Sequence, residues 1–173
     1  MDKRIALHIS ILFISILAAQ VLICNHILLF GVAMPLVTVY FIARTPIGIN
    51  RNILLTLAFL LGLAVDICSD TPGLNALACT LAAAMRRPVF FAYVQNDDRV
   101  KDIIPNIRTL GIADYCKYLL TLAAIYCLMI FSIEYFSFAD IKEIAVLTSC
   151  STILTFVLLL GLDSLVTVRR ERH

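Results

Sequence analysis

A long apolar run near the beginning of the chain constrains the fold more than any other feature. Residues Ile5 to Ala43 are predominantly apolar, with breaks at Cys24-Asn25-His26 and Gly31. As one helix this run would be roughly 58 Å long at about 1.5 Å per residue, about twice the ~30 Å hydrocarbon core of a bilayer. The run therefore predicts two crossings with a turn near Asn25-His26. No convincing small-x-small cleavage site follows the first part, so we expect an uncleaved first span.

The composition agrees with a chain that lies mostly in lipid. Of the 173 residues, 61% are apolar and 15% are charged, against about 45–50% and about 25% in soluble domains. A chain of this size has one modest core, so a water-soluble globule could not bury the excess. We expect one all-α integral membrane domain, residues 1–173, built as a compact bundle of six transmembrane helices. The expected spans cover about residues 5–24, 28–43, 53–67, 73–85, 115–136 and 144–168.

Residues 58–84 contain two apolar runs that meet at a short polar turn. On the incoming run, Ala58, Gly62 and Asp66 recur every four residues, which places them along one side of a helix. Small residues on such a side let two helix backbones approach closely. The outgoing run follows Thr71-Pro72, a capping residue and a proline that suits the first helical position. We therefore expect a tight helical hairpin at the centre of the bundle, with the other segments as its wrapping.

The basic residues are distributed unevenly about the six expected spans. With six crossings, every lysine and arginine except Lys142 falls on one side. Cytoplasmic loops of membrane proteins carry an excess of these residues, so that side is predicted to be the cytoplasm, together with both termini and a polar loop at 86–113. Such a basic face suits cytoplasmic partners or anionic lipid. On the same side, Asp163 could pair with Arg108 or Lys117.

Asp66 and Asp70 are ionisable residues expected at the outer end of the third span. Such groups near lipid are costly, commonly face the bundle interior and mark candidate functional sites. A partner cation would then come from another protein, because Lys142 is the one basic residue expected on that side. Alternatively, both aspartates lie at headgroup level and cap the turn, with Asp70 or Thr71 accepting N–H bonds from the fourth span. The sequence leaves both interpretations open.

Other polar and small residues are expected to hold helices together. Gln20, at the end of the first span, is expected to bridge helices through its amide. Pro35 interrupts the second span and leaves a carbonyl group that needs a neighbouring donor, such as Thr38 or another helix. The candidates for partner binding or bundle packing are Gln20, Pro35, Ala58, Gly62, Asp66, Asp70, Gly73 and Ala76.

The sequence contains no pattern that indicates catalysis. No metalloprotease, nucleophile-elbow or P-loop motif occurs. The histidines are too scattered for a metal site, and no two of the six cysteines form a C-x-x-C pair. Most of the cysteines are expected to act as small hydrophobic residues, with a Cys24–Cys68 bridge as the one disulfide considered. We expect no enzyme, no cofactor, no metal and no nucleic-acid partner.

The order and spacing of several residues resemble a known family. They are Gln20 closing the first helix, Pro35-Leu36-Val37 and Tyr40 in the second, Gly62-x-x-x-Asp66 in the third, and Thr71-Pro72-Gly73-Leu74-x-Ala76-Leu77 opening the fourth. With six short spans and minimal loops, the pattern looks like the MreD family of rod shape-determining membrane proteins of bacteria, over most of the chain. The resemblance implies a six-helix bundle similar to the substrate-binding components of energy-coupling-factor vitamin transporters.

What the resemblance implies is a non-enzymatic scaffold of the cell-elongation (rod) complex in the bacterial cytoplasmic (inner) membrane. Members of the family bind the bitopic protein MreC and work with the actin-like MreB and the peptidoglycan glycosyltransferase and transpeptidase of side-wall growth. Membrane lipid and a second copy of the chain are further expected partners. The alternative is a transporter subunit that binds a small vitamin-like molecule in an outward pocket near Asn25, Asp70 and Glu134.

Overall fold

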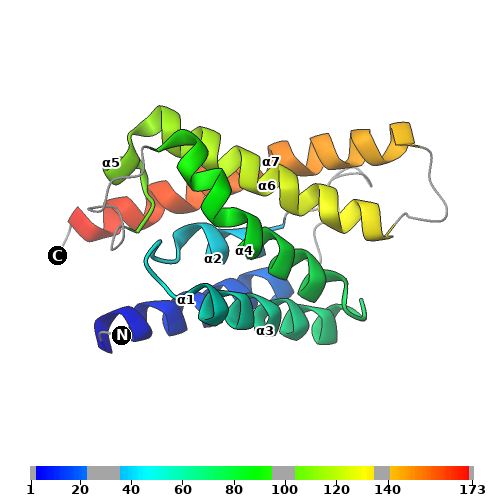
Figure 1. Ribbon diagram of the computed structural model, residues 1–173, viewed down its shortest axis with the longest axis horizontal. Helices are drawn as coiled ribbons and strands as arrows, with labels where there is room; N and C mark the ends of the chain where they lie inside the picture. The colour runs from blue at the N-terminus through cyan, green and yellow to red at the C-terminus, as the bar shows by residue number, and fades with distance from the viewer. Residues whose placement is uncertain (1–2, 23–35, 95–103, 135–140, 172–173) are drawn as a thin grey trace.

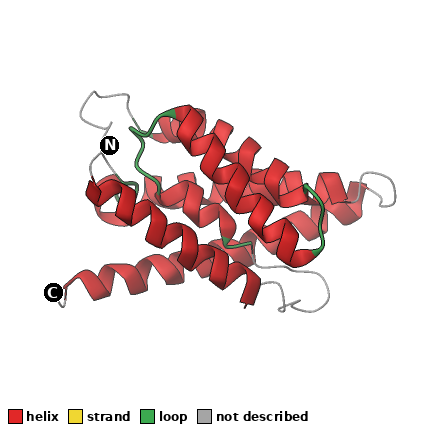
Figure 2. Cartoon of the chain, turned by 90° about the horizontal axis from the view of Figure 1, so that it is seen from below, coloured by secondary structure: helices red, strands yellow, loops and turns green. Residues whose placement is uncertain are grey.

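The computed structural model describes residues 3–22, 36–94, 104–134 and 141–171. All regular secondary structure within these ranges is helical, as Figure 2 shows. In chain order the helices are α1 (Lys3–Leu22), α2 (Thr38–Arg44), α3 (Arg51–Ser69), α4 (Leu74–Tyr93), α5 (Ile107–Leu110), α6 (Ile112–Glu134) and α7 (Ile141–Glu171).

Three helical stretches in the described ranges are long and apolar enough to cross a membrane. They are Arg51–Ser69, Ile112–Glu134 and Ile144–Asp163, the last within α7. A shorter apolar stretch, Ile9–Val21, lies in α1. An all-helical chain with such segments has the architecture of a helical membrane protein, because a helix satisfies its own backbone polar groups in lipid. Length and apolar content therefore support three of the six crossings expected from the sequence, and do not by themselves support the other three within the described residues.

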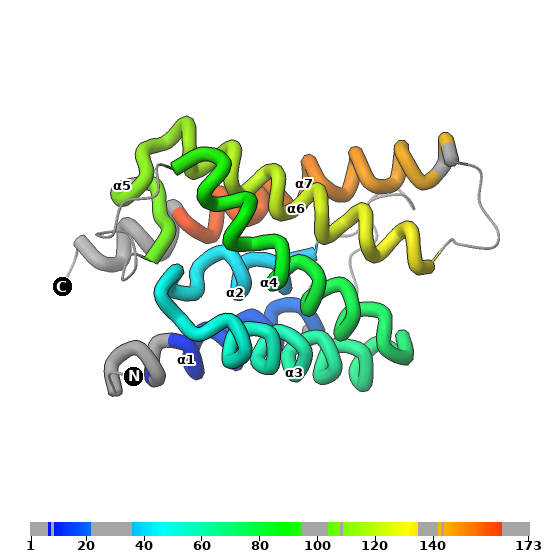
Figure 3. The backbone as a smooth tube through the Cα atoms, in the orientation of Figure 1, coloured from blue at the N-terminus to red at the C-terminus, as the bar shows by residue number. Residues whose placement is uncertain are grey.

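The long helices form a bundle in which sequence neighbours lie side by side. α3 packs against α4, α4 against α6, and α6 against α7. α1 lies beside α3, on the opposite side of the molecule from α6 and α7 (Figure 1). The tube in Figure 3 shows α4 running obliquely between these two groups of helices. α4 therefore connects the two halves of the bundle.

The short helix α2 occupies the centre of the bundle. All seven of its residues are buried, and it contacts α1, α3, α4 and α6. Phe41 of α2 meets Phe13 of α1 edge to face, with ring centroids 5.7 Å apart. α3, by contrast, buries one side and leaves the other exposed, as an amphipathic helix does. The expectation that the 58–84 hairpin forms the centre is therefore correct only in part: α4 lies in the middle of the bundle beside α2, whereas α3 lies at its side.

The expected second span, 28–43, is not one continuous helix in its described part. Leu36 and Val37 lie outside any helix, and α2 begins at Thr38. The N–H groups of Leu36 and Val37 bind polar side chains of α7 and α1 instead of helix carbonyl groups. The apolar character of this segment predicted that it would be buried, but it did not predict that the helix would begin only at Thr38. Pro35 and the effect expected of it lie outside the described residues.

The helix that contains the expected fourth span, 73–85, extends into the segment 86–113 that was expected to be a loop. α4 continues to Tyr93 and contains Pro88, and α5 with the start of α6 occupies the end of the expected loop. The Arg-Arg-Pro sequence resembles a helix stop. The helix continues because the first of these arginines, Arg86, is buried and bonded within the bundle. The other expected spans overlap α1, α3, α6 and α7 with bounds that differ by a few residues.

Candidate functional site

α3 and α4 approach each other closely where Gly62 faces Ala76. A Cβ atom added to Gly62 would lie 2.5 Å from the Cα of Ala76 and 2.5 Å from the carbonyl oxygen of Asn75. Contacts this short do not occur between a real Cβ and backbone atoms, so glycine is required here. Ala58, one turn earlier on α3, is fully buried. The small side of α3 therefore packs against α4 of the same chain.

The carboxylate of Asp66 binds the first turn of α4. Its Oδ1 accepts the backbone N–H of Asn75 at 2.9 Å, and its Oδ2 accepts that of Ala76 at 2.9 Å. Oδ1 also accepts the side-chain N–H of Asn75 at 3.0 Å and the Thr71 hydroxyl at 2.9 Å. Asp66 is only 3% exposed. The first turn of a helix has unsatisfied N–H groups and a partial positive charge, so a buried carboxylate is stabilised there.

Asp66 thus supplies a cap that the N-cap residue of α4 cannot provide. α4 begins at Leu74, and its N-cap residue is Gly73 with φ 83°. The helix therefore begins slightly later in the chain than the start expected at Thr71-Pro72. Glycine accepts the left-handed backbone conformation but has no side chain with which to bind the helix N–H groups. The acceptor comes instead from the preceding helix.

Asp70 does not take the capping role considered for it. It is exposed and in the left-handed conformation, with φ 53°, and its backbone N–H donates to the Asp66 carbonyl oxygen at the end of α3. Thr71 accepts the side-chain N–H of Asn75 at its hydroxyl, at 3.2 Å, and the backbone N–H of Leu74 at its carbonyl oxygen, at 3.4 Å. The backbone N–H groups of Asn75 and Ala76 bind Asp66. Groups of the same chain therefore stabilise the Asp66 carboxylate.

The contacts of Asp66 continue into α6 through Asn75. The Tyr126 hydroxyl donates to Asn75 Oδ1 at 3.3 Å and lies 3.5 Å from Cys79 Sγ. Asn75, Cys79 and Tyr126 are all buried. We call the five residues Asp66, Thr71, Asn75, Cys79 and Tyr126 the hairpin cluster. This cluster joins α3, α4 and α6 through polar contacts.

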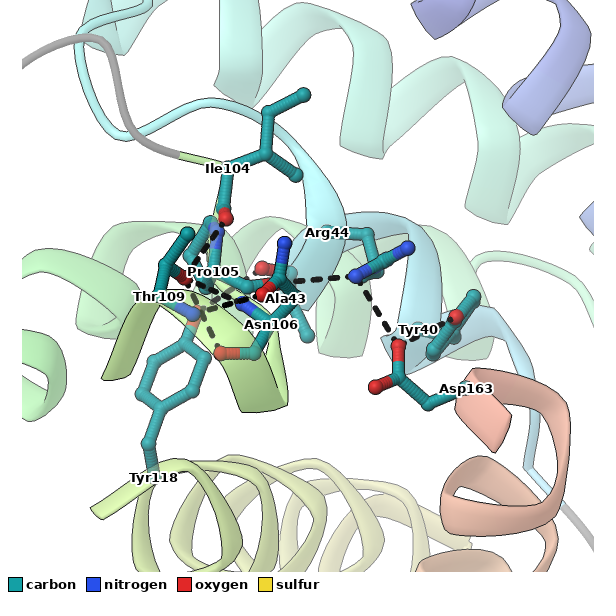
Figure 4. A network of polar contacts seen from close by, with 9 residues as sticks. All are labelled: Tyr40, Ala43, Arg44, Ile104, Pro105, Asn106, Thr109, Tyr118 and Asp163. Atoms are coloured by element: carbon teal, nitrogen blue, oxygen red, sulfur yellow. Dashed lines mark hydrogen bonds and ion pairs between the residues drawn. The ribbon is translucent and has the colours of Figure 1, made fainter. Parts of the chain in front are cut away.

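A second group of buried polar residues joins α2, α7 and the segment before α5 (Figure 4). Arg44 Nη1 lies 3.0 Å from Asp163 Oδ1 and donates to the carbonyl oxygen of Pro105 at 3.3 Å. The Tyr40 hydroxyl donates to the same Asp163 oxygen at 3.2 Å. The Asp163 side chain is fully buried and that of Arg44 is 8% exposed. We call Tyr40, Arg44, Pro105 and Asp163 the arginine cluster.

The arginine cluster gives Asp163 a partner that the sequence analysis did not name. Arg44 pairs with Asp163, whereas the Nζ of Lys117 lies 3.5 Å from the carboxylate of Asp114 in an exposed pair. The side chain of Arg108 lies outside the described part of the structure. Arg44 closes one apolar run and Asp163 lies inside another, and charged groups buried in apolar segments commonly pair. That signal was available in the sequence.

Arg86 ties α4 to the link between α2 and α3. It is 1% exposed, and its guanidinium donates to the carbonyl oxygens of Thr45 and Pro46 and to the Tyr118 hydroxyl. Tyr118 in turn donates to the Ala43 carbonyl oxygen at 3.4 Å, the contact drawn in Figure 4. Arg86, expected in a cytoplasmic loop, is instead a buried residue that binds the backbone of another segment.

Two side chains satisfy the backbone just before α2. Gln20 of α1 is 2% exposed, and its Oε1 accepts the Val37 N–H at 2.8 Å. Thr155 of α7 is fully buried, and its Oγ1 accepts the Leu36 N–H at 3.1 Å. Gln20 therefore bridges two segments of the chain through its amide. These bonds replace those that a continuous helix would have supplied.

The structure brings half of the candidate residues together. Ala58, Gly62, Asp66 and Ala76 lie on the facing sides of α3 and α4. Asp70 and Gly73 are exposed at the turn, Gln20 lies at a different helix contact, and Pro35 lies outside the described residues. Five other buried residues that form these polar contacts were not singled out in the sequence analysis: Arg44, Asn75, Arg86, Tyr118 and Tyr126.

Within the described ranges, no group of three histidine, cysteine or acidic side chains is placed to hold a metal ion. Cys68 carries a free, exposed thiol, and Cys24, its considered disulfide partner, lies outside those ranges. Comparisons with protein-family models, with curated proteins and with solved structures found no match.

Proposed function

We propose that this chain is a non-enzymatic membrane scaffold of the bacterial cell-elongation complex, located in the cytoplasmic membrane. In this proposal it binds a bitopic partner of the MreC type through membrane helices. Through that partner it works with MreB and with the glycosyltransferase and transpeptidase that build side-wall peptidoglycan. The proposal rests on the resemblance to the MreD family together with the way the structure uses its polar residues.

The observation that carries the proposal is the internal use of the buried charged groups. Asp66 binds the start of α4, Asp163 binds Arg44, and Arg86 binds carbonyl groups of the α2–α3 link. Each of these residues joins segments of the same chain. Groups committed in this way hold a bundle in one shape, which favours a structural role over a chemical one.

The exposed sides of the helices supply the surface that a partner helix needs. On α3, Phe59, Leu63 and Ile67 recur every four residues and are 45%, 37% and 73% exposed. This spacing forms a continuous apolar stripe along one side of the helix. In a bilayer such a stripe contacts lipid or another helix. We place the partner helix on this α3 stripe, because the small residues of the neighbouring side are already used against α4.

A specific observation also favours the alternative, a subunit that binds a small molecule. A wide cavity of about 540 Å³ opens beside the turn between α3 and α4, and Asp66 and Asp70 are among its lining residues. Both carboxylate oxygens of Asp66 already accept hydrogen bonds from α4. Asp70 alone would then provide a carboxylate for a ligand, whereas ligand pockets combine several convergent polar groups. The scaffold is therefore the better supported function.

Co-purification with site-specific photo-crosslinking tests the proposal. The chain is co-expressed with a bitopic MreC-type protein and carries a photo-crosslinking residue at Phe59, Leu63 or Ile67. Matched positions on α6, Leu120 and Leu128, are also exposed and apolar. We expect the partner to be retained in mild detergent and to crosslink from the α3 stripe more strongly than from α6. Retention of no bitopic partner, combined with tight binding of a vitamin-like ligand, would contradict the scaffold and favour the alternative.

A further inference from the structure

A second cavity lies where α3 begins and α4 approaches its end. It has a volume of about 240 Å³. Its lining residues are Arg51, Leu54, Ala83, Ala84, Met85, Arg86, Arg87 and Pro88. Arg51 and Arg87 are exposed, whereas Leu54 and Ala83 are buried. The cavity thus has an apolar floor, with two exposed guanidinium groups among the residues around it.

The charged residues that line this cavity are all cationic. Its lining includes three arginines and no carboxylate, in contrast to the cavity beside the α3–α4 turn, which includes two aspartates. Arg86 is committed to backbone carbonyl groups. Arg87 makes two long contacts from Nη2, at 3.4 Å to the carbonyl oxygen of Ile47 and at 3.5 Å to that of Ile49. A guanidinium has five N–H donors in a planar fork that matches phosphate oxygens, so Arg87 can bind an anion as well.

The position of the cavity on α3 supports an anionic ligand. Arg51 is the first residue of α3, and the N-cap residue, Asn50, makes no side-chain bond to the helix. The start of α4, by comparison, is capped by the Asp66 carboxylate. The partial positive charge at the start of α3 adds to that of the two exposed arginines.

We propose that this cavity binds the phosphate headgroup of an anionic phospholipid. Arg51 and Arg87 hold the phosphate, and the apolar floor formed by Leu54 and Ala83 receives the start of an acyl chain. A membrane lipid is the occupant because the cavity combines cationic and apolar lining at one end of α3, a helix that is long and apolar enough to cross a bilayer. The inference is independent of the proposed scaffold function.

Lipid binding to the purified full chain tests the proposal. Native mass spectrometry in a mild detergent counts bound phosphatidylglycerol, with phosphatidylcholine as the neutral probe and inorganic phosphate as competitor. The variants are Arg51→Gln with Arg87→Gln, and Lys117→Gln as the matched control. Lys117 is exposed, carries the same charge and lies outside the cavity. Circular dichroism confirms that each variant is folded, and Arg86 is left unchanged because it holds the bundle together.

We expect the wild-type chain to bind phosphatidylglycerol in preference to phosphatidylcholine. The double variant should lose affinity for phosphatidylglycerol by on the order of tenfold or more, because each arginine near an anionic lipid contributes roughly fivefold. Lys117→Gln should bind as the wild type does. Equal binding of the two lipids, unchanged binding by the double variant, or displacement of the lipid by millimolar inorganic phosphate would each overturn the proposal.

Discussion

Asp66 closes the hairpin of α3 and α4 by accepting the backbone N–H of Ala76 at 2.9 Å, across ten residues of sequence. The same carboxylate accepts the N–H of Asn75. A helix start in an apolar environment is otherwise left with unsatisfied donors. Asp66, for which the sequence left a functional and a capping role open, is therefore the residue that holds the hairpin together.

Replacing Asp66 by alanine should lower the free energy of unfolding by roughly 2–4 kcal/mol, because two buried N–H groups lose a charged acceptor. Asp66→Asn keeps one acceptor oxygen and should cost less. Asp70→Asn is the control, since Asp70 is exposed and its substitution should change the free energy by no more than about 0.5 kcal/mol. Thermal unfolding in detergent measures all three. An equal loss at both positions would contradict the capping role.

Gly62→Ala should destabilise the protein by about 1–3 kcal/mol, since the new Cβ would meet the backbone of α4 and force the helices apart. Gly161 in α7 provides the matched control, because a Cβ there meets nothing within 4 Å. Gly161→Ala should stabilise the helix by roughly 0.5–1 kcal/mol. Unfolding in detergent measures the stability of both variants, and cysteine crosslinking between α3 and α4 measures the separation of the two helices. If Gly62→Ala left both unchanged, the close approach of these helices would be wrong.

Arg44→Leu should destabilise the protein by about 3–5 kcal/mol, because it removes a cation that lies 3.0 Å from the buried Asp163 carboxylate. The double variant Arg44→Leu with Asp163→Leu should be more stable than the single variant, since no uncompensated charge remains. A double-mutant cycle of unfolding free energies measures this coupling.

The exposed pair Lys117–Asp114 is the control for the arginine cluster. Lys117→Met should change the free energy of unfolding by less than about 1 kcal/mol, because exposed ion pairs contribute little. Additive effects of the Arg44 and Asp163 substitutions would show that the two groups do not interact.

Arg86→Lys should cost about 1–3 kcal/mol, because a lysine cannot reproduce the planar set of donors and leaves a buried carbonyl unsatisfied. Arg87 is the adjacent control: it is exposed, so Arg87→Lys should remain within about 0.5 kcal/mol of the wild type. Unfolding in a zwitterionic detergent separates the two effects from any contribution of anionic lipid. Equal tolerance of lysine at both positions would show that Arg86 does not support the α2–α3 link.

The part of the fold that could be predicted from the sequence is the part held by local contacts. Gly62 and Asp66 recur at helical spacing, and their contacts with Ala76 lie a short way along the chain. Small residues at that spacing indicate a close helix pair whatever lies around it. The existence of the hairpin followed from this pattern, although the exact start of α4 did not, because Gly73 provides no side-chain cap signal.

The central position of α2 could not be derived in the same way. In a chain this apolar, hydropathy does not distinguish a lipid-facing segment from one enclosed by other helices. Tyr40 reaches Asp163 across 123 residues of sequence, and Leu36 reaches Thr155 across 119. Such contacts depend on which helices are neighbours in space, and no local spacing encodes that. Charged residues in two apolar segments indicated that they could pair, but the sequence did not show that α2 and α7 are neighbours, so the arginine cluster was missed.

The Asp66 carboxylate, which belongs to α3 but accepts N–H groups at the start of α4, has a consequence for membrane insertion. These oxygen atoms belong to a residue that is synthesised before α4. The N–H groups in the first turn of α4 therefore find their acceptor only when the end of α3 has already formed a helix. During translocon-mediated insertion the two segments should therefore partition into lipid as a pair. Cutting the chain in the turn and supplying the halves separately would leave the second half without its acceptor and hinder its partitioning.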